Sequence, residues 1–443
     1  MTGRVVQSAC LMFDAINLEG STTRRVGSLT ACKEQFLEVA AFPYPIGTAV
    51  RIGLAAGGHV TGEVVGFRGR TSIIQPFSQN PCVSTGSPVI PCGRHDRISC
   101  GQGLLGRIID AQGMPLDGRP LGQCADTWPI AGIATNPLSR GRVVRPIDCG
   151  VRAINGLLTL GEGQRVAIIA GSGVGKSVLM GQILEGVDAD IIVTGLIGER
   201  AREVSDFIAT KLTPRIAAKS VVVAVAADCS PLLRLRAAMR ATAIAEYFRA
   251  QGKKVLLLID SLTRVAHAQR EIGLALGEPP TMKGYTPSSL SLIPQLVERS
   301  GVDSRSGGSI TAIYTVLADS GDLDDPIVDA ARAIADGHIV LSRTLAENGL
   351  YPAIDIARSL SRVMSDIVDA DHLAAATRFR QLWSTHEQNR DLLMMGAYVA
   401  GADPVLDQAI AAVPGMLEYV GQPIHESVSF AESRDALIEG FAA

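Results

Sequence analysis

The sequence predicts an α/β fold in which a mostly parallel β-sheet has helices on both faces, with a β-barrel before it and a helical domain after it. Apolar segments of strand length alternate with helical segments after residue 146, which is the order expected for a parallel sheet. These segments, such as VLLLI before Asp260, are apolar at every position, as expected for strands covered on both faces. The two ends of the chain have different patterns, so we expect three domains, at residues 1–94, 95–366 and 367–443.

The first domain is predicted from alternating apolar residues. GEVVGF (62–67) and SIIQ (72–75) are short alternating segments separated by glycine and proline, which is typical of half-buried strands in a small all-β barrel. Residues 101–122, GQGLLGRIIDAQGMPLDGRPLG, predict another pair of strands around a glycine and proline turn. A connector rich in proline leads to the start of the central domain at Pro146.

In the central domain, strands are expected to alternate with helices. The strands are predicted at 165–170, 191–197, 220–227, 254–259, 309–317 and 338–341. The predicted helices include one from Lys176, one at 198–211 and a long one at 232–251. Further on, apolar spacing indicates helix within 371–400, a helix start at Asp403 and Pro404, and a final helix at 432–441. Ligands of such sheets lie at the carboxyl ends of the strands.

The composition disfavours several classes of protein. With 47% hydrophobic and 19% charged residues, the 443-residue chain is expected to bury large cores rather than to be disordered. A formal net charge of -3 without a long basic run does not suggest a nucleic-acid partner. No apolar run approaches the roughly 18 residues of a membrane span. Asp14 interrupts the apolar start, so we expect a cytoplasmic protein without a signal peptide. The eight cysteines include no CxxC pair and are expected to be reduced thiols.

The segment RVAIIAGSGVGKSVLMGQ (165–182) predicts a phosphate-binding loop between a strand and a helix. Glycines let backbone N–H groups face an anion, and the helix N-terminus adds roughly +0.5 of an elementary charge. Lys176 is expected to reach the β- and γ-phosphates, and the Ser177 hydroxyl to coordinate Mg²⁺. The predicted nucleotide-binding residues of the loop are Ala170, Gly171, Ser172, Gly173, Val174, Gly175, Lys176, Ser177 and Val178. The order of strand, loop and helix disfavours an ordinary glycine-rich turn, although Ala170 stands where the strict pattern has glycine.

Acidic residues at the ends of two other predicted strands are candidate catalytic and metal-binding groups. Asp260 ends KVLLLID, where a carboxylate can hold Mg²⁺ through its water shell; alone, such an aspartate can be only a turn former. Glu199 and Arg200 follow directly on another strand in GLIGERAREV. Glu199 could polarise the attacking water, Arg200 could neutralise phosphate charge, and Glu203 could join the Mg²⁺ and water network. The alternative is a solvated, salt-bridged helix start.

The segment GLYPAIDIARSLSR (349–362) supplies two further candidates. Tyr351 could stack on a purine, with Pro352 holding the turn rigid, or it could be a surface tyrosine beside a turn. Arg362 could serve a second site, because phosphoryl transfer often uses a guanidinium from a neighbouring subunit, worth roughly 10³ to 10⁵ in rate. In that case the protein must self-associate.

Seven segments together carry a family resemblance. They are AGSGVGKSVLMGQ, GLIGERAREV, LLLIDSLTR, AQREIGLALGEPPTMKGYTPSSL, GSITAIYTVL, DGHIVLSR and YPAIDIARSLSR. In this order they resemble the flagellar protein export ATPases, the type III secretion relatives of the catalytic β subunit of rotary ATP synthases. PAIDIARSLS (352–361) also resembles the signature of the whole superfamily. The resemblance extends from about Gly3 to the C-terminus, and NRDLLMMGAYVAGADPVLDQAI (389–410) is more similar to the flagellar branch than to the injectisome branch.

The resemblance implies an architecture and a set of partners. It implies a RecA-like P-loop core between an N-terminal β-barrel and a C-terminal helical domain, assembled as a homohexamer that hydrolyses ATP with Mg²⁺. The implied partners are a peripheral-stalk-like regulator, a central-stalk-like protein, membrane proteins of the export gate and substrate–chaperone complexes, with the ring held peripherally at the inner membrane. ADSGDLDDP (318–326) resembles the loop that faces the central stalk and lacks the residues of a calcium loop.

The resemblance also implies roles for single residues. The implied catalytic residues are Glu199, Lys176, Arg200 and, in trans as an arginine finger, Arg362. The implied Mg²⁺ site consists of Ser177, Asp260 and Glu203. Tyr351 and Phe430 would flank adenine.

The chain departs from the family pattern in two places. It reaches the barrel almost directly from Met1, where the family usually has a further amphipathic helix that binds the regulator, and TPSSLSL (286–292) replaces the usual PPSVF run.

Three other functions are open at this point. One is the ATPase of a virulence-type injectisome, and another is a ring subunit that binds nucleotide without hydrolysis, although such subunits commonly carry an amide where this chain has Glu199. The third is an RNA translocase, which the 4% aromatic content and the negative net charge disfavour.

Overall fold

The computed structural model describes residues 25–441, except residues 34, 80, 135 and 319–321. The expectations about the start of the chain and part of the acidic loop at 318–326 lie outside the described residues. The chain divides into two compact units, Met1–His95 and Asp96–Ala443. The predicted boundary at residue 366 stays a prediction.

The first unit contains the predicted barrel. Its strands are β1 (Gly27–Lys33), β2 (Phe36–Ala40), β3 (Thr48–Gly53), β4 (His59–Arg68), β5 (Thr71–Pro76) and β6 (Pro88–Arg94). They close in the order β1-β2-β5-β4-β3-β6, with antiparallel neighbours. Inward-facing apolar residues such as Leu37, Val39, Ile52 and Ile74 are fully buried and form one core. The alternation in the sequence therefore corresponds to the inside and outside of a closed sheet.

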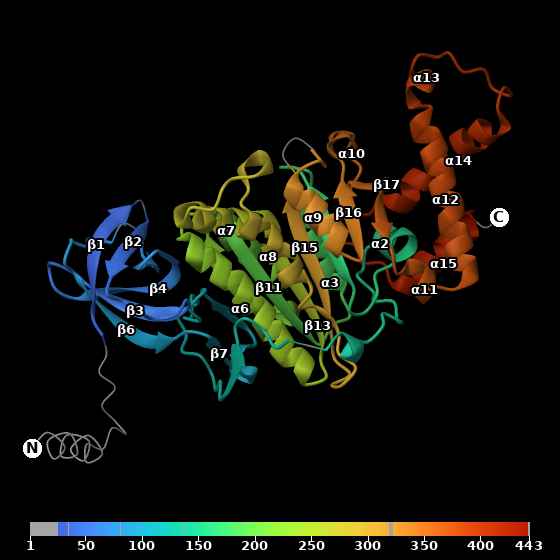
Figure 1. The fold of residues 1–443 in the computed structure, drawn as a ribbon. Helices are drawn as coiled ribbons and strands as arrows, with labels where there is room; N and C mark the ends of the chain where they lie inside the picture. The colour runs from blue at the N-terminus through green and yellow to red at the C-terminus, as the bar shows by residue number, and fades with distance from the viewer. Residues whose placement is uncertain (1–24, 34, 80, 135, 319–321, 442–443) are drawn as a thin grey trace, which may run out of the picture. The chain divides into compact units, whose positions relative to one another are not determined.

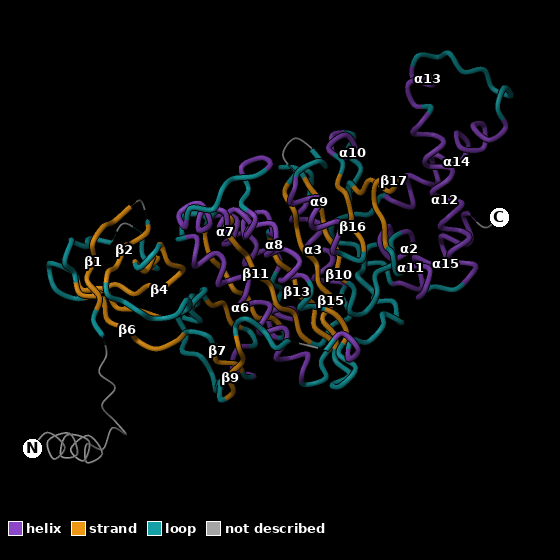
Figure 2. Tube along the Cα trace, in the orientation of Figure 1, coloured by secondary structure: helices purple, strands orange, loops and turns teal. Residues whose placement is uncertain are grey.

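The second unit is built on one large sheet, whose strands are drawn in orange in Figure 2. Its strands are β8 (Arg107–Ile109), β10 (Arg165–Ala170), β11 (Ile191–Glu199), β12 (Ser220–Ala226), β13 (Lys254–Asp260), β14 (Gly301–Val302), β15 (Ser309–Leu317), β16 (Gly337–Leu341) and β17 (Ile354–Ser361). The order is β17-β16-β10-β15-β13-β11-β12-β8, with β14 beside β15. All neighbours are parallel except β16 with β17 and β14 with β15. The prediction of a mostly parallel sheet is confirmed.

Helices cover both faces of this sheet, as predicted (Figure 1). One face packs against α6 (Pro231–Ala250), α7 (Leu262–Leu276), α8 (Pro287–Val297) and α9 (Pro326–Ile334), where Ala167 and Ile169 of β10 join the core. The alternate residues Val166 and Ile168 face the opposite core. That core contains α2 (Arg152–Leu157), α3 (Lys176–Gly186), α4 (Ala201–Lys211), α5 (Pro214–Ala218), α12 (Ala370–Gln388), α14 (Pro404–Val420) and α15 (Phe430–Phe441). Strands with two buried faces explain the continuous apolar segments.

The C-terminal helices share this second core with the sheet. Phe379 and Trp383 of α12, Tyr419 of α14 and Phe441 of α15 pack in one aromatic cluster. Asp403 accepts the backbone N–H groups of Val405 and Leu406, so the predicted start of α14 is correct. The remaining helices are α10 (Arg343–Glu347), α11 (Met364–Ile367) and α13 (Arg390–Met394), with 3-10 turns at Gln102–Leu104, Pro137–Ser139 and Met282–Gly284. No helix among the described residues is long and apolar enough to span a membrane.

Three local predictions are wrong. β17 was not expected as a strand, because only Ile354 and Ile356 show the alternation of an edge strand. Residues 101–122 do not form two paired strands: β8 joins the edge of the large sheet beside β12, while β7 (Arg97–Cys100) pairs with β9 (Asp126–Pro129). The predicted helix at 198–211 begins later, because β11 continues to Glu199.

Candidate active site

The glycine-rich loop connects β10 to α3 where the sequence predicts it. β10 ends at Ala170, and α3 begins at Lys176. Gly173 and Gly175 have φ angles of +78° and +92°. Residues with a Cβ adopt this conformation at a cost of roughly 1–2 kcal/mol. The loop therefore leads into α3 with the free N–H groups of the first helical turn at the carboxyl edge of the sheet, which is the geometry of an anion cradle.

A cavity of about 450 Å³ lies over the loop. It has the size of a small-molecule site. The predicted residues that line it are Ala170, Gly171, Ser172, Gly173, Gly175, Lys176, Ser177, Val178, Glu199, Arg200, Glu203 and Asp260. Val174 is different, because its side chain is only 3% exposed and belongs to the hydrophobic core. The structure thus brings the loop together with both strand-end acids.

Lys176 lies at the centre of the polar contacts in the cavity. Its Nζ is 2.5 Å from Asp260 Oδ1 and 3.9 Å from Glu199 Oε1. Asp260 Oδ1 also accepts a hydrogen bond from Thr315 Oγ1 at 2.6 Å. Thr315 follows Tyr314, which pairs with Ile259 across β13 and β15, so the sheet register places the hydroxyl beside the carboxylate. Sequence reasoning missed Thr315, because this contact depends on strand order.

Glu199 is a buried carboxylate, and one of its two oxygens lacks a hydrogen bond among the described residues. Its residue exposure is 8%, and among the described residues its Oε1 has no hydrogen-bond partner. Burial, followed by the negative charge of Asp260, raises the pKa of Glu199 to about 7. Polar atoms buried without partners are uncommon in proteins and are often found at functional sites. One carboxylate oxygen in the wall of the cavity is therefore left without a hydrogen bond among the described residues.

Arg200, Glu203 and Arg264 also line the cavity. Arg200 caps the start of α4, and its side chain is 79% exposed. It forms an ion pair of 3.4 Å with Glu203, as expected for the alternative of a salt-bridged helix start. Arg264, in the first turn of α7, also lines the cavity, and among the described atoms its buried Nε has no partner. Sequence reasoning missed Arg264, although it belongs to the quoted segment LLLIDSLTR.

The two predicted adenine-flanking residues lie outside this cavity. Tyr351 lies beside the loop: a Cβ at Gly175 would be 3.2 Å from its Cε1 atom. The Phe430 ring packs on His372 with ring centroids 5.7 Å apart, and its backbone N–H donates to Asp148 Oδ2 at 2.8 Å. Tyr351 is therefore close to the cradle, whereas Phe430 belongs to the packing of α15 against α12.

Arg362 lies at the opposite end of the strands from the cradle, near the start of β10 and β16. It follows Ser361, which pairs with Gly337 at the start of β16, and β16 runs parallel to β10. The guanidinium is exposed and donates to the Arg332 carbonyl at 3.1 Å. Six residues of β10 span about 20 Å, which exceeds the reach of an arginine side chain. Arg362 therefore cannot serve the cavity of its own chain.

These features define the class of the protein. A parallel sheet carries a glycine cradle at the end of one strand and buried acids at the ends of two others, on one edge and around one cavity. This is the construction of a P-loop nucleotide-binding protein.

Comparisons with known proteins identify the family. Residues 150–361 match the ATP synthase alpha/beta family, nucleotide-binding domain, and residues 368–439 match the T3SS EscN ATPase C-terminal domain. A flagellum-specific ATP synthase of Pseudomonas aeruginosa is 51% identical over 95% of this chain and 92% of its own length. A type 3 secretion system ATPase of Pseudomonas syringae pv. tomato is 43% identical over 96% of this chain and 94% of its own length. The structure of the assembled ATPase EscN from enteropathogenic E. coli matches with a TM-score of 0.89 and 40% identity, covering 94% of this chain and 100% of that one.

The chain belongs to the family of flagellum-specific ATP synthases and type III secretion ATPases. It is an ATP-hydrolysing enzyme of this family, so the predicted resemblance and the predicted enzyme class are confirmed. The family assignment excludes the hypothesis of an RNA translocase.

Proposed function

We propose that this chain is the ATPase subunit of a flagellar protein export apparatus, where ATP hydrolysis assists the delivery and unfolding of export substrates. The observation that carries the catalytic proposal is the position of Glu199. Its Oε1 has no hydrogen-bond partner among the described residues and lies 3.9 Å from Lys176 Nζ, beside the cradle for the phosphates. A carboxylate in this place can orient and polarise a water molecule for attack on the γ-phosphate.

The other residues of the cavity would hold the triphosphate. The N–H groups before and within the first turn of α3 would bind phosphate oxygens, and Lys176 would exchange its contact with Asp260 for the β- and γ-phosphates. Arg200, which is exposed at the rim, would add positive charge there. Tyr351, beside Gly175, would stack on the adenine, whereas a role for Phe430 requires that α15 presents its ring differently.

The donor set of the cavity fits Mg²⁺. Ser177 supplies a hydroxyl, and Asp260 and Glu203 supply carboxylates, which are hard oxygen ligands. No cluster of three or more His, Cys, Asp or Glu side chains that could hold a metal occurs in the described part of the chain. Mg²⁺ commonly binds through few protein ligands, water and substrate phosphates, so this arrangement suits it. When bound, Mg²⁺ would neutralise charge on the phosphates.

The substitution Glu199→Gln tests the catalytic proposal. The amide keeps the shape of the side chain but is a far poorer base, so we expect nucleotide affinity within about twofold of wild type and a loss of hydrolysis of at least 100-fold. Nucleotide binding is measured by calorimetry and turnover by phosphate release. Glu439→Gln, an exposed change on α15, is the matched control. Turnover near the wild-type rate in Glu199→Gln would remove this residue from the mechanism.

Arg362 would complete the site of a neighbouring subunit in a homohexamer. Its distance from its own cradle supports this proposal, because the guanidinium can contact a nucleotide only across an interface. We expect that Lys176→Ala chains and Arg362→Ala chains, each with only a low residual activity alone, regain hydrolysis when mixed, since one intact composite site can form between them. Activity per chain should also rise with protein concentration. Failure to regain activity at any mixing ratio would contradict a finger supplied in trans.

The remaining partners follow from the relatives. One solved relative is described as assembled EscN and another as EscN in complex with its central stalk EscO. By this similarity we propose a homohexameric ring with a central-stalk-like partner, a peripheral-stalk-like regulator, export-gate membrane proteins and substrate–chaperone complexes. We propose that the ring lies in the cytoplasm, peripherally bound to the inner-membrane apparatus.

An injectisome ATPase is the second candidate. It is supported by the match of residues 368–439 to the EscN C-terminal domain and by the secretion relatives at 42–43% identity. A deletion strain separates the two functions. Loss of motility and of secreted flagellar proteins supports the flagellar proposal, whereas intact motility with loss of secreted effectors supports the injectisome.

A further inference from the structure

Gln164, the residue directly before β10, is fully buried, and both the oxygen and the nitrogen of its side-chain amide form hydrogen bonds. Its Oε1 accepts the backbone N–H of Gly161 at 2.8 Å. Its Nε2 donates to the Asp336 carbonyl and to Ser361 Oγ, both at 3.1 Å. A buried amide with these contacts fixes the relative positions of three segments that are distant in the sequence.

Both acceptors of Nε2 lie next to the backbone of Arg362. The Arg362 N–H donates to the same Asp336 carbonyl at 2.9 Å. Ser361 is the preceding residue, and its hydroxyl donates to the Thr159 carbonyl at 2.8 Å. By contrast, among the described residues the guanidinium has one hydrogen bond, to the Arg332 carbonyl. The backbone is therefore held tightly at the base of a side chain whose tip is exposed.

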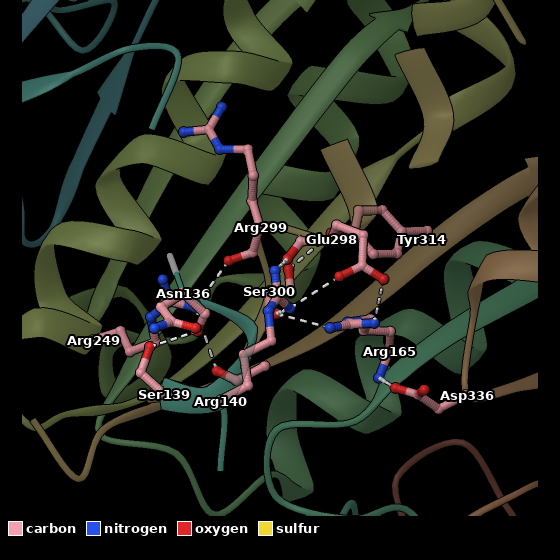
Figure 3. Close-up of polar contacts among 11 residues, drawn as sticks. Asn136, Ser139, Arg140, Arg165, Arg249, Glu298, Arg299, Ser300, Tyr314 and Asp336 are labelled. Carbon is pink, nitrogen blue, oxygen red and sulfur yellow. Dashed lines mark hydrogen bonds and ion pairs between the residues drawn. The ribbon is translucent and has the colours of Figure 1, made fainter. Parts of the chain in front are cut away.

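Asp336 is itself held against β10. Its backbone N–H donates to the Arg165 carbonyl at 2.8 Å, and its Oδ2 accepts the Arg165 N–H at 3.1 Å. The Arg165 side chain continues the network to Glu298 at 2.9 Å, which also pairs with Arg140 at 3.0 Å (Figure 3). The carbonyl that receives both Gln164 and Arg362 thus cannot shift unless the start of β10 also shifts.

We infer that Gln164 is a positioning residue for Arg362, and that it acts on the active site of the neighbouring subunit rather than on the cradle of its own chain. This inference rests on the proposed function of Arg362 in trans. Loss of the amide removes its hydrogen bonds to Ser361 Oγ and to the Asp336 carbonyl, which also accepts the Arg362 N–H. Displacement of a catalytic group by about 1 Å can cost as much as 100-fold in rate. β10 carries the cradle of the same chain at its other end. An effect of Gln164 on Arg362 must therefore be distinguished by experiment from an effect on that cradle.

Gln164→Leu is the test variant, because leucine is close in volume and lacks the amide. We expect kcat to fall about tenfold while the affinity for ADP stays unchanged. In an Arg362→Ala background the same substitution should cause no further loss of kcat, since residues that act through one another are not additive. Gln75→Leu is the matched control: Gln75 is equally buried in the barrel, and no hydrogen bond of its amide is found among the described atoms. It should leave kcat unchanged.

Subunit mixing decides which site Gln164 serves. Gln164→Leu chains have an intact cradle, and Lys176→Ala chains have an intact finger with its anchor. A mixture should therefore hydrolyse ATP several-fold faster per Gln164→Leu chain than that variant alone. If this mixture shows no gain but the mixture of Lys176→Ala and Arg362→Ala does, the inference about Gln164 is overturned, while the proposal that Arg362 acts in trans stands. No gain in either mixture would overturn the finger in trans, and this inference with it.

A second variant covers the case in which Gln164→Leu does not fold. Ser361→Ala removes the hydroxyl that links Gln164 to Thr159, and it should lower kcat and respond to mixing in the same way. Ser361→Thr, which keeps a hydroxyl, should retain more activity than Ser361→Ala. Equal activity of these two variants and the wild-type chain would overturn the inference.

Discussion

Alanine substitutions at the three glycines of the phosphate loop should weaken nucleotide binding to different and predictable extents. Gly171 does not have a positive φ, and the one described atom that a Cβ there would meet within 4 Å is the Ala318 carbonyl oxygen, at an ordinary 3.6 Å. Gly173 has a φ of +78°, but a Cβ there would have no described atom within 4 Å. Gly175 has a φ of +92°, and its Cβ would lie 3.2 Å from the Tyr351 ring. The three sites thus separate backbone strain from a side-chain clash.

The expected magnitudes follow from this geometry. Gly171→Ala should change the Kd for ADP by less than about twofold. Gly173→Ala lets the free loop relax, and restoring its conformation costs about 1–2 kcal/mol, which corresponds to a Kd about 5- to 30-fold higher. Gly175→Ala adds the contact with Tyr351, which costs about 1 kcal/mol more, or a further fivefold.

Calorimetric titration with ADP measures these affinities, and thermal unfolding of each variant checks the fold. In a Tyr351→Ala background, the penalties of Gly173→Ala and Gly175→Ala should become equal, because the clash is then absent. Three equal penalties, or the largest penalty at Gly171, would refute the reasoning.

Two further predictions concern buried polar groups. Thr315→Val removes the hydrogen bond to Asp260, so it should lower the free energy of unfolding by about 1–3 kcal/mol and slow ATP hydrolysis. Thr315→Ser, which keeps the hydroxyl, should recover both the stability and the rate. An unchanged stability and rate in the valine variant would contradict this role. Burial lowers the pKa of His372, whose Nε2 contacts the Gly156 carbonyl oxygen at 2.8 Å, so the unfolded chain binds a proton more readily than the folded protein. The free energy of unfolding should therefore decrease as the pH falls below about 6.5, and His372→Gln should flatten part of this dependence in urea titrations at about pH 7.5 and about pH 5.5. An identical pH dependence in both proteins would contradict this assignment.

The parts of the site that could be predicted from the sequence are those set by local order along the chain. The strand, loop and helix around Lys176 follow one another directly, so the cradle was visible as a pattern. Glu199 and Asp260 were predicted near it because acids at the carboxyl ends of parallel strands reach one edge of the sheet. Such inferences need only the class of the sheet.

The remaining parts depend on which strands are neighbours and on their register. Thr315 reaches Asp260 because β15 lies beside β13, which no local pattern indicates. The anchoring of Arg362 by Gln164 joins segments almost 200 residues apart, through an edge strand that the sequence pattern did not predict. Phe430 was placed by resemblance alone, and its contact with His372 arises from helix packing.

The single core shared by α3 and the C-terminal helices has a mechanical consequence. Gln182 of α3 donates to the Pro423 carbonyl at 3.2 Å, and a Cβ on Gly186 would lie 2.5 Å from the Gly150 Cα. α3 is therefore closely packed against both of these segments. Close-packed interiors transmit displacement rather than absorb it. A displacement of α3 on phosphate binding would therefore pass to the C-terminal helices that share its core, α12, α14 and α15.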